Sequence, residues 1–258
     1  MKAALLTVLL ALLCAGSSCA AAGELTVAAA ADLSLALQPV VKNFERQTGN
    51  IVRLSFGSSG DFFNQIQNGA PYDVFLSADL GYPQKLAKLG FADGGSLRTY
   101  AVGRLVLWVA NSSKLDLEHQ GMRALTDPSV QKIAIANPQH APYGRAAVAA
   151  LRHFGLYDQL TSRLVLGENV GQAAQFAESG NAQVGLIALA HAVAPSVRPL
   201  GRYWLVPTDS YPALNQGAVI ISRSRNKTMA KQFLKYLAGP EAQAIFRQFG
   251  FEAPQEAR

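Results

Sequence analysis

Short apolar segments alternate with segments of helical periodicity, and this alternation restricts the possible folds more than any other feature. The first apolar segments cover residues 25–30, 51–56 and 73–79, and helical patterns follow them at 32–49, 61–69 and 80–90. The same order returns between residues 132 and 192. Strands separated by helices of this length usually pair in parallel, because the helix carries the chain back to the start of the next strand. We therefore predict an α/β protein with mixed, mainly parallel sheets flanked by helices.

The first helical pattern is the most detailed. It predicts a helix from Asp32 to Gly49, with Leu33, Leu37, Val40, Val41 and Phe44 on its apolar face. Pro39 is expected to bend or interrupt this helix, because proline lacks the N–H that a helix interior requires. Gly49 is expected to cap its end.

Two β-rich passages without helices, residues 97–113 and 203–222, break the alternation. We interpret them as two strands that cross between two lobes and act as a hinge. The first lobe would comprise residues 23–102 and 219–258, and the second lobe residues 103–218. A cleft between two lobes is a common ligand site.

The first 22 residues have the pattern of a secretion signal, with Lys2, an apolar core and an exit of small residues. Cleavage before Gly23 predicts an exported chain. Acylation of Cys19 is the alternative, and the lack of a large apolar residue three positions upstream disfavours it. Since Cys14 and Cys19 are the only cysteines, cleavage would leave no thiol for a disulfide or a metal.

The formal net charge is +6, but Lys and Arg are scattered along the chain. The longest basic cluster, Ser222 to Lys227, is too short to indicate a nucleic-acid groove. We expect no nucleic-acid partner. A diffuse positive field would instead favour the approach of a small anion.

Enzyme motifs are absent from the sequence: it has no HExxH, GxSxG or P-loop pattern. Ser59, His140 and Asp73 can be combined into a triad on paper, but their spacing does not favour one. We predict that the protein is not an enzyme, and a secreted serine hydrolase that uses Ser59 is the distant alternative.

Four predicted loops lead from a strand into a helix start, at residues 28–34, 56–63, 138–147 and 166–176. A helix start presents free backbone N–H groups and the positive end of the helix dipole, which together can hold an anion. Any one of these loops is more simply read as ordinary capping. Two of them fall in each predicted lobe, at the carboxyl ends of strands, where open α/β sheets bind ligands. Together they predict an anion site built from neutral donors.

At these loops the sequence resembles the periplasmic molybdate-binding proteins of ABC transporters, the ModA family, which have the type II periplasmic binding protein fold. The resemblance runs from about Glu24 to Phe251. "NGAPYDVFLSAD", residues 68–79, is its most specific stretch, and "LTVAAAADL", "PQHAPYGRAA" and "GENVGQAAQF" add to it.

This resemblance implies that a tetrahedral oxyanion, molybdate or tungstate, binds between the lobes and is delivered to the membrane permease of an ABC transporter. The ligand positions of the family fall on Asp32, Ser59, Tyr143 and Val170. A fifth position, a tyrosine in some members, is Ala188 here. Molybdenum would be bound only as the oxyanion, by the same residues, with no cofactor. We expect a periplasmic or otherwise extracytoplasmic monomer. The alternative ligand is another oxyanion, phosphate-like or sulfate, or a small organic acid.

Asp32 is the unusual member of this set, because the family has a neutral donor there and a carboxylate repels a dianion. Three accounts are open. In the account we favour, Asp32 only caps the helix start by accepting from the N–H groups of Ser34 or Leu35. Its carboxylate would otherwise accept a hydrogen bond from a protonated oxyanion, or coordinate the metal centre directly.

Overall fold

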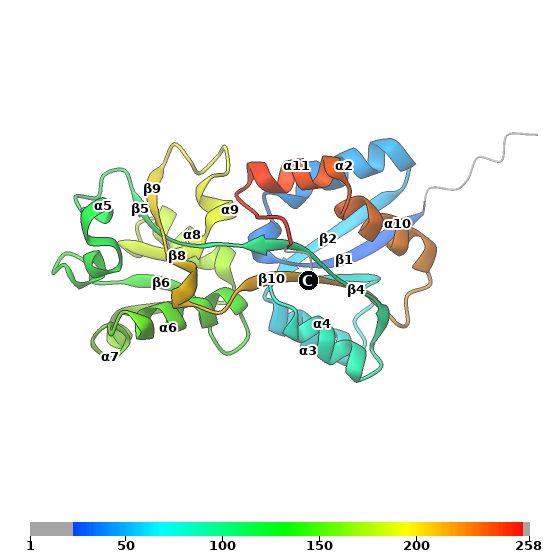
Figure 1. Cartoon of the computed structure of the whole chain (residues 1–258), viewed down its shortest axis with the longest axis horizontal. Coiled ribbons are helices and arrows are strands. Elements are labelled where there is room, and N and C mark those ends of the chain that lie inside the picture. Colours follow the sequence, from blue (N-terminus) through cyan, green and yellow to red (C-terminus); the bar gives the residue numbers. More distant parts are fainter. Residues whose placement is uncertain (1–22, 255–258) are drawn as a thin grey trace, which may run out of the picture.

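The structure is a computed structural model that describes residues 23–254. The predicted signal peptide at residues 1–22, with the Cys19 alternative, lies outside these residues. Two five-stranded sheets, each flanked by helices, form two lobes that lie side by side (Figure 1). The predicted fold class, a two-lobed α/β protein of the periplasmic binding protein type II, is confirmed.

Lobe 1 is built on a sheet with the strand order β2-β1-β3-β10-β4. Strand β1 pairs in parallel with β2 and β3, while β10 runs antiparallel to β3 and β4. Its elements are β1 (Glu24–Ala30), the 3-10 turn η1 (Ala31–Leu33), α2 (Leu37–Thr48), β2 (Ile51–Gly57), α3 (Ser59–Gln67), β3 (Val74–Ser77), α4 (Gly81–Lys88), β4 (Ala92–Gly103), β10 (Leu214–Ile221), α10 (Lys227–Leu237) and α11 (Pro240–Gln248).

Lobe 2 is built on a sheet with the order β7-β6-β8-β5-β9, in which β6 pairs in parallel with β7 and β8 and β5 is antiparallel to its neighbours. Its elements are β5 (Leu105–Ala110), α5 (Leu117–Gln120), η2 (Gly121–Thr126), β6 (Ile133–Ala136), α6 (Pro142–His153), α7 (Tyr157–Leu160), η3 (Thr161–Arg163), β7 (Leu164–Gly167), α8 (Val170–Glu178), β8 (Val184–Ala188), α9 (Leu189–Ala192), β9 (Gly201–Leu205) and η4 (Thr208–Ser210).

The chain crosses between the lobes twice, as the β-rich passages indicated. Arg104 alone separates β4 in the first sheet from β5 in the second, and the return crossing runs from β9 to β10 (Figure 1). Because all of β10 belongs to the first sheet, the return crossing lies before Leu214, a few residues earlier than position 218. The exact domain boundaries remain our proposal.

The single helix expected from Asp32 is wrong. The chain forms η1, then a turn, and α2 begins only at Leu37. Pro39 explains the interruption, because its ring would clash with the carbonyl of Leu35 in a continuous helix. In the observed structure Pro39 lies in the first turn of α2, where no backbone N–H is needed. Gly49 ends α2 in the left-handed conformation, at φ 71°, as predicted.

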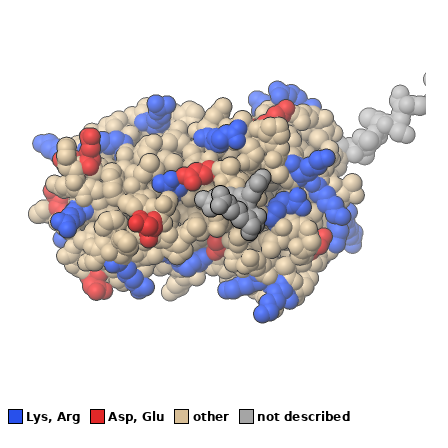
Figure 2. Space-filling view, viewed as in Figure 1, with Lys and Arg blue, Asp and Glu red and all other residues tan. Residues whose placement is uncertain are grey.

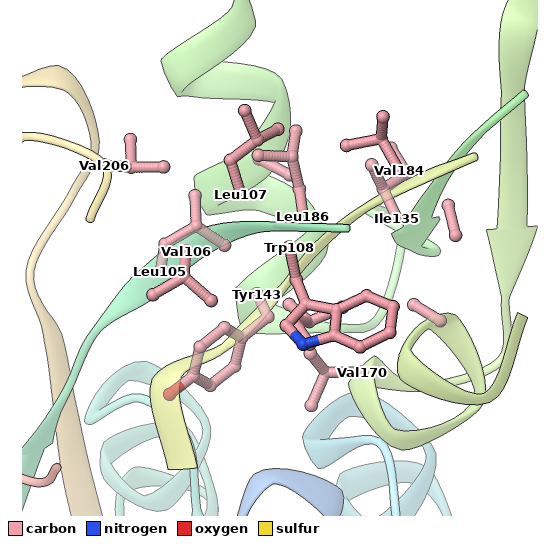
Figure 3. Packing of buried hydrophobic residues seen from close by; sticks show 14 of the residues in the cluster. Leu105, Val106, Leu107, Trp108, Ile135, Tyr143, Val170, Val184, Leu186 and Val206 are labelled. Atoms are coloured by element: carbon pink, nitrogen blue, oxygen red, sulfur yellow. The ribbon is translucent and has the colours of Figure 1, made fainter. Parts of the chain in front are cut away.

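Each lobe has its own apolar core. In lobe 1 the predicted apolar face of α2 is buried, and Phe44 packs edge-on against Phe233 of α10. In lobe 2 the core surrounds Trp108 of β5. Figure 3 shows Tyr143 and Val170 beside this indole, so two of the four predicted site residues are fixed by the lobe 2 core.

The surface agrees with the diffuse charge predicted from the sequence. Figure 2 shows Lys and Arg spread over this face of both lobes, with Asp and Glu between them. None of the helices in residues 23–254 combines the length and the apolar character that a membrane span requires.

Candidate functional site

The four predicted loops meet at one small cavity between the lobes. Asp32 and Ser59 reach it from lobe 1, and Tyr143 and Val170 reach it from lobe 2. The centre of a water-sized sphere can occupy a volume of about 10 Å³ inside it. A cavity of this size has room for a single small ion or a water molecule and not for a larger organic ligand. The four predicted residues are buried, and contacts cross between the lobes beside them, so the lobes are closed around the site.

The lining of the cavity explains what it can bind. Besides the four predicted residues it consists of Ala30, Ala31, Gly57, Ser58, Ala78, Ala141, Pro142 and Asn169. Among these residues there is no Lys, Arg or His side chain. Three helices, α3, α6 and α8, begin at the cavity, so their N–H groups and dipoles are the sources of positive potential.

Ser59 is the first residue of α3 and is buried. The preceding Ser58 caps the helix, because its hydroxyl oxygen accepts a hydrogen bond from Asp61 N at 3.2 Å. The Ser59 hydroxyl oxygen accepts from Ala78 N at 3.0 Å. With this acceptor bond made, the hydroxyl hydrogen of Ser59 is available to donate to an anion in the cavity.

Tyr143 and Val170 stand at the two helix starts of lobe 2. Val170 is the first residue of α8, and Asn169 caps that helix by accepting from Gln172 N at 3.1 Å. Tyr143 follows Pro142 in the first turn of α6. Its ring is buried beside Trp108, and its hydroxyl points away from that indole (Figure 3). Among the described residues this hydroxyl has no hydrogen-bond partner.

The predicted cap at Asp32 is wrong. Asp32 is the middle residue of η1, no side chain caps this turn, and Ser34 N donates to the Ala31 carbonyl instead. The Asp32 side chain is fully buried, and its Oδ2 accepts from Gln216 Nε2 at 2.7 Å. The Gln216 Oε1 in turn accepts from the Tyr100 hydroxyl at 3.2 Å. Gln216 lies on β10, and this long-range partner draws the carboxyl inward rather than back along its own turn.

Burial raises the pKa of Asp32 from 3.8 to about 7, although Gln216, Tyr143 and nearby backbone N–H groups oppose the rise. Of these groups only the Gln216 amide forms a hydrogen bond of good geometry, and Oδ1 of Asp32 has no partner within residues 23–254. Burial also raises the pKa of Tyr143 well above 10.0, and the neighbouring Asp32 adds to this rise. At neutral pH the site therefore contains a neutral phenol and a carboxyl near its midpoint of titration.

Ala188, the position of the fifth family ligand, is buried at the end of β8 and pairs with Leu105 of β5. It is not part of the cavity lining. No side-chain donor is contributed from this strand end, and the phenol of Tyr143 is the aromatic hydroxyl at the cavity.

A second set of contacts holds the lobes together beside the cavity. The carbonyl oxygen of His140 accepts from Gly60 N at 2.9 Å and from the Tyr82 hydroxyl at 3.3 Å. Arg145 of α6 forms an ion pair with Asp79 of lobe 1, and its guanidinium lies 5.3 Å from the centre of the Tyr82 ring. Arg145 therefore connects the two lobes. These contacts depend on how the lobes close, so no local sequence pattern marks them.

The serine hydrolase triad is not assembled. His140 Nδ1 lies 2.8 Å from Ser58 Oγ, not from Ser59, and 3.4 Å from Asp61 Oδ2. A catalytic triad needs the serine and the acid on different ring nitrogens, whereas here both lie at Nδ1. Asp73 binds Thr26 and Ser224 elsewhere in lobe 1.

Asp61, His140 and Glu168 are the one group in the described part of the chain whose side chains have the chemistry of metal ligands and lie close together, within 4.8 Å. Asp61 and Glu168 are partly or fully exposed, and the His140 ring is engaged by Ser58. We interpret this group as a polar rim where the lobes meet.

Comparison with known proteins agrees with this architecture. Residues 25–252 match the family model of the bacterial extracellular solute-binding proteins. The molybdate-binding protein ModA of Azotobacter vinelandii is 41% identical over 235 residues, which cover 91% of this chain and 92% of that protein. The chain belongs to the ModA family of bacterial extracellular solute-binding proteins.

Further relatives of this solute-binding protein support the assignment. ModA of Rhodobacter capsulatus is 40% identical over 232 residues, 90% of this chain and 89% of that protein. The solved periplasmic molybdate-binding protein of A. vinelandii matches with a TM-score of 0.85 and covers 90% of this chain and 100% of its own. The sulfate-binding protein SubI of Mycobacterium tuberculosis, at 15% identity and a TM-score of 0.76, shares the fold alone. It covers 91% of this chain and 88% of its own.

Proposed function

We propose that this solute-binding protein captures molybdate or tungstate in the cavity between its lobes and presents the closed form to the permease of an ABC transporter. The observation that carries the proposal is the convergence of four loops on one closed cavity without a basic side chain. Similarity to ModA proteins that bind molybdate supports the choice of ligand.

The proposed contacts are made to the oxygens of the anion and not to the metal. The hydroxyls of Ser59 and Tyr143 and the backbone N–H groups at the start of α8, including Val170, would donate to these oxygens, and Asp32 completes the set from lobe 1. A dianion held by helix starts and neutral donors needs no buried counter-charge. Such a site selects by size and by the number of donors. Molybdate and tungstate have nearly the same size and charge, so we expect no strong discrimination between them.

Lobe closure couples binding to transport in this proposal. Each lobe supplies about half of the donors, so an anion bound to both lobes stabilises the closed form over the open form. The ion pair between Arg145 and Asp79 would add to this closed form. A permease that recognises the closed shape would then receive only loaded protein.

The remaining parts of the proposal concern the cell. We propose export by the segment 1–22, a periplasmic location without lipid at Cys19, a monomer, no cofactor and no catalysis. The arrangement of His140, with serine and acid at one ring nitrogen, supports a binding protein over a hydrolase.

Titration calorimetry of the exported protein with molybdate, tungstate, sulfate and phosphate tests the proposed ligand. We expect one molybdate or tungstate per chain, bound more tightly than sulfate or phosphate. Ser59→Ala should weaken binding, whereas Ser179→Ala, at the exposed end of α8, should not. Tight binding of phosphate with none of molybdate would instead favour the alternative, in which Asp32 accepts a hydrogen bond from a protonated oxyanion.

A further inference from the structure

Asp32 leaves one oxygen without a partner in a site that should hold a dianion. Its side chain is fully buried, and it lines the cavity. Oδ2 is occupied by the Gln216 amide at 2.7 Å, while Oδ1 has no hydrogen-bond partner in the described part of the chain. A buried polar atom without a partner is costly, and native proteins usually provide one. The Tyr143 hydroxyl lies close enough to influence the pKa of Asp32 but forms no hydrogen bond of good geometry with it, which leaves an anion in the cavity as the candidate partner.

The charges around Asp32 decide which way such a hydrogen bond can run. A carboxylate offers only acceptors, and so do the oxygens of an unprotonated dianion, so the two would repel each other without any shared hydrogen. A carboxylic acid carries one O–H donor, and this donor can reach an oxygen of the anion. The neutral acid then donates a hydrogen bond to the anion, as a neutral amide or hydroxyl would at the same position.

Within residues 23–254, no cation near Asp32 would hold it in its charged form. The charge of Asp32 acts on two phenols, Tyr143 of α6 and Tyr100 of β4, and burial raises the pKa of each well above 10.0. Both phenols are therefore neutral. The guanidinium of Arg104, next to the end of β4, is paired with Glu252.

The elements packed against η1 also bring no positive charge to the cavity. His191 of α9 places Nε2 3.3 Å from Ser34 Oγ, and burial lowers its pKa to about 4, so the ring is neutral. Glu178 stands at the far end of α8 from the cavity. Arg53 of β2 is exposed and pairs with Glu24.

We propose that Asp32 is a protonated carboxylic acid in the ligand-bound protein and donates a hydrogen bond from Oδ1 to an oxygen of the oxyanion. This inference rests on the proposed function. One proton from the solvent enters with each anion whenever the free carboxyl is ionised, and the bound anion keeps its full charge. Asp32 thereby makes the site specific for oxyanions without a proton of their own.

The consequence is a dependence of affinity on pH that the ligand itself cannot cause, because molybdate and sulfate stay unprotonated dianions around neutral pH. Burial raises the pKa of Asp32 to about 7 in the closed structure without a ligand. Below this value the carboxyl already carries its proton and affinity is constant. Above it, the protonated fraction falls tenfold for each pH unit, so the Kd for molybdate should rise about tenfold per unit.

Calorimetric titration with sodium molybdate between about pH 6 and about pH 9 tests the proposal. At each pH the titration is run in two buffers of different ionisation enthalpy, which gives the number of protons taken up. We expect uptake near zero at the acid end and of about one proton per anion at the alkaline end. The matched variant Asp32→Asn supplies an amide donor, so its Kd should be flat and its uptake zero.

The outcomes separate this inference from the proposed function. A wild-type Kd that stays flat, with no proton uptake, would overturn the role of Asp32 and leave molybdate binding intact. Failure of both folded proteins, wild type and Asp32→Asn, to bind molybdate or tungstate at any pH would overturn the proposed function. Phosphate bound more tightly at high pH than molybdate would show that the carboxylate accepts a hydrogen bond from a protonated ligand, the opposite of the proposal. The uptake measured on wild type decides the matter even if the variant does not fold.

Discussion

The buried carboxyl of Asp32 should make the closed form of the ligand-free protein less stable as the pH rises. Burial raises its pKa from 3.8 to about 7, so between these values the folded chain keeps a proton that the unfolded chain has lost. Stability therefore falls as the pH rises through this window and is constant above it. Asp32→Asn removes the titrating group while its side-chain oxygen can still accept from Gln216.

The size of the effect follows from the same two pKa values. One unit corresponds to about 1.4 kcal/mol, so the whole window is worth about 4 kcal/mol. Between about pH 5 and about pH 8 the free energy of unfolding of the wild type should fall by about 3 kcal/mol relative to that of Asp32→Asn. Relaxation of the lobes around the charge would reduce the loss, which makes this value an upper limit.

Urea unfolding of ligand-free wild type, Asp32→Asn and Asp209→Asn at several pH values measures this difference. Asp209 is exposed on η4, so its variant should follow the wild type at every pH. Comparison at each pH cancels the titration of all other groups. A gap between wild type and Asp32→Asn that stays constant within about 0.5 kcal/mol would refute the reasoning.

Three further predictions concern the lobe contacts and the loops. Arg145→Gln should weaken molybdate binding roughly two- to fivefold, seen as faster release in stopped flow, because it removes a partly exposed ion pair between the lobes. Arg152→Gln on the same helix should leave binding unchanged, because Arg152 packs on Tyr157 within lobe 2. Equal losses in the two variants would show that the Arg145–Asp79 pair does not stabilise the closed form. Gly144→Ala would press a methyl group onto backbone at the end of β6 and should cost about 1–3 kcal/mol in urea unfolding. Gly94→Ala, whose added carbon meets nothing closer than 3.8 Å, is the control, and equal stability of the two would be a contrary result. The His191 ring should titrate in NMR near pH 4, because burial lowers its pKa to about 4, and a midpoint near 6.5 would contradict its burial.

The sequence was sufficient for the fold class because the relevant signals are local. The alternation of strands and helices, the two β-rich passages and the glycine after α2 each act within a few residues. The same local signals placed the start of α2 at Asp32, five residues too early. The apolar pattern continues through Leu33, and only the ring of Pro39 decides that helix and turn must separate there.

Some features of the site also follow from local sequence, whereas others depend on the tertiary structure. The sequence by itself predicted four loops of helix-start chemistry, and the resemblance to the ModA family placed the proposed donors at Ser59, Tyr143 and Val170 on these loops. Only the tertiary structure decided how Asp32 behaves, since its partner Gln216 comes from a strand 184 positions away and burial comes from both lobes. Hydrogen-bond partners and desolvation depend on which segments meet in space, and a sequence pattern carries neither. For that reason the sequence favoured a simple cap at Asp32, where the structure places a buried acid.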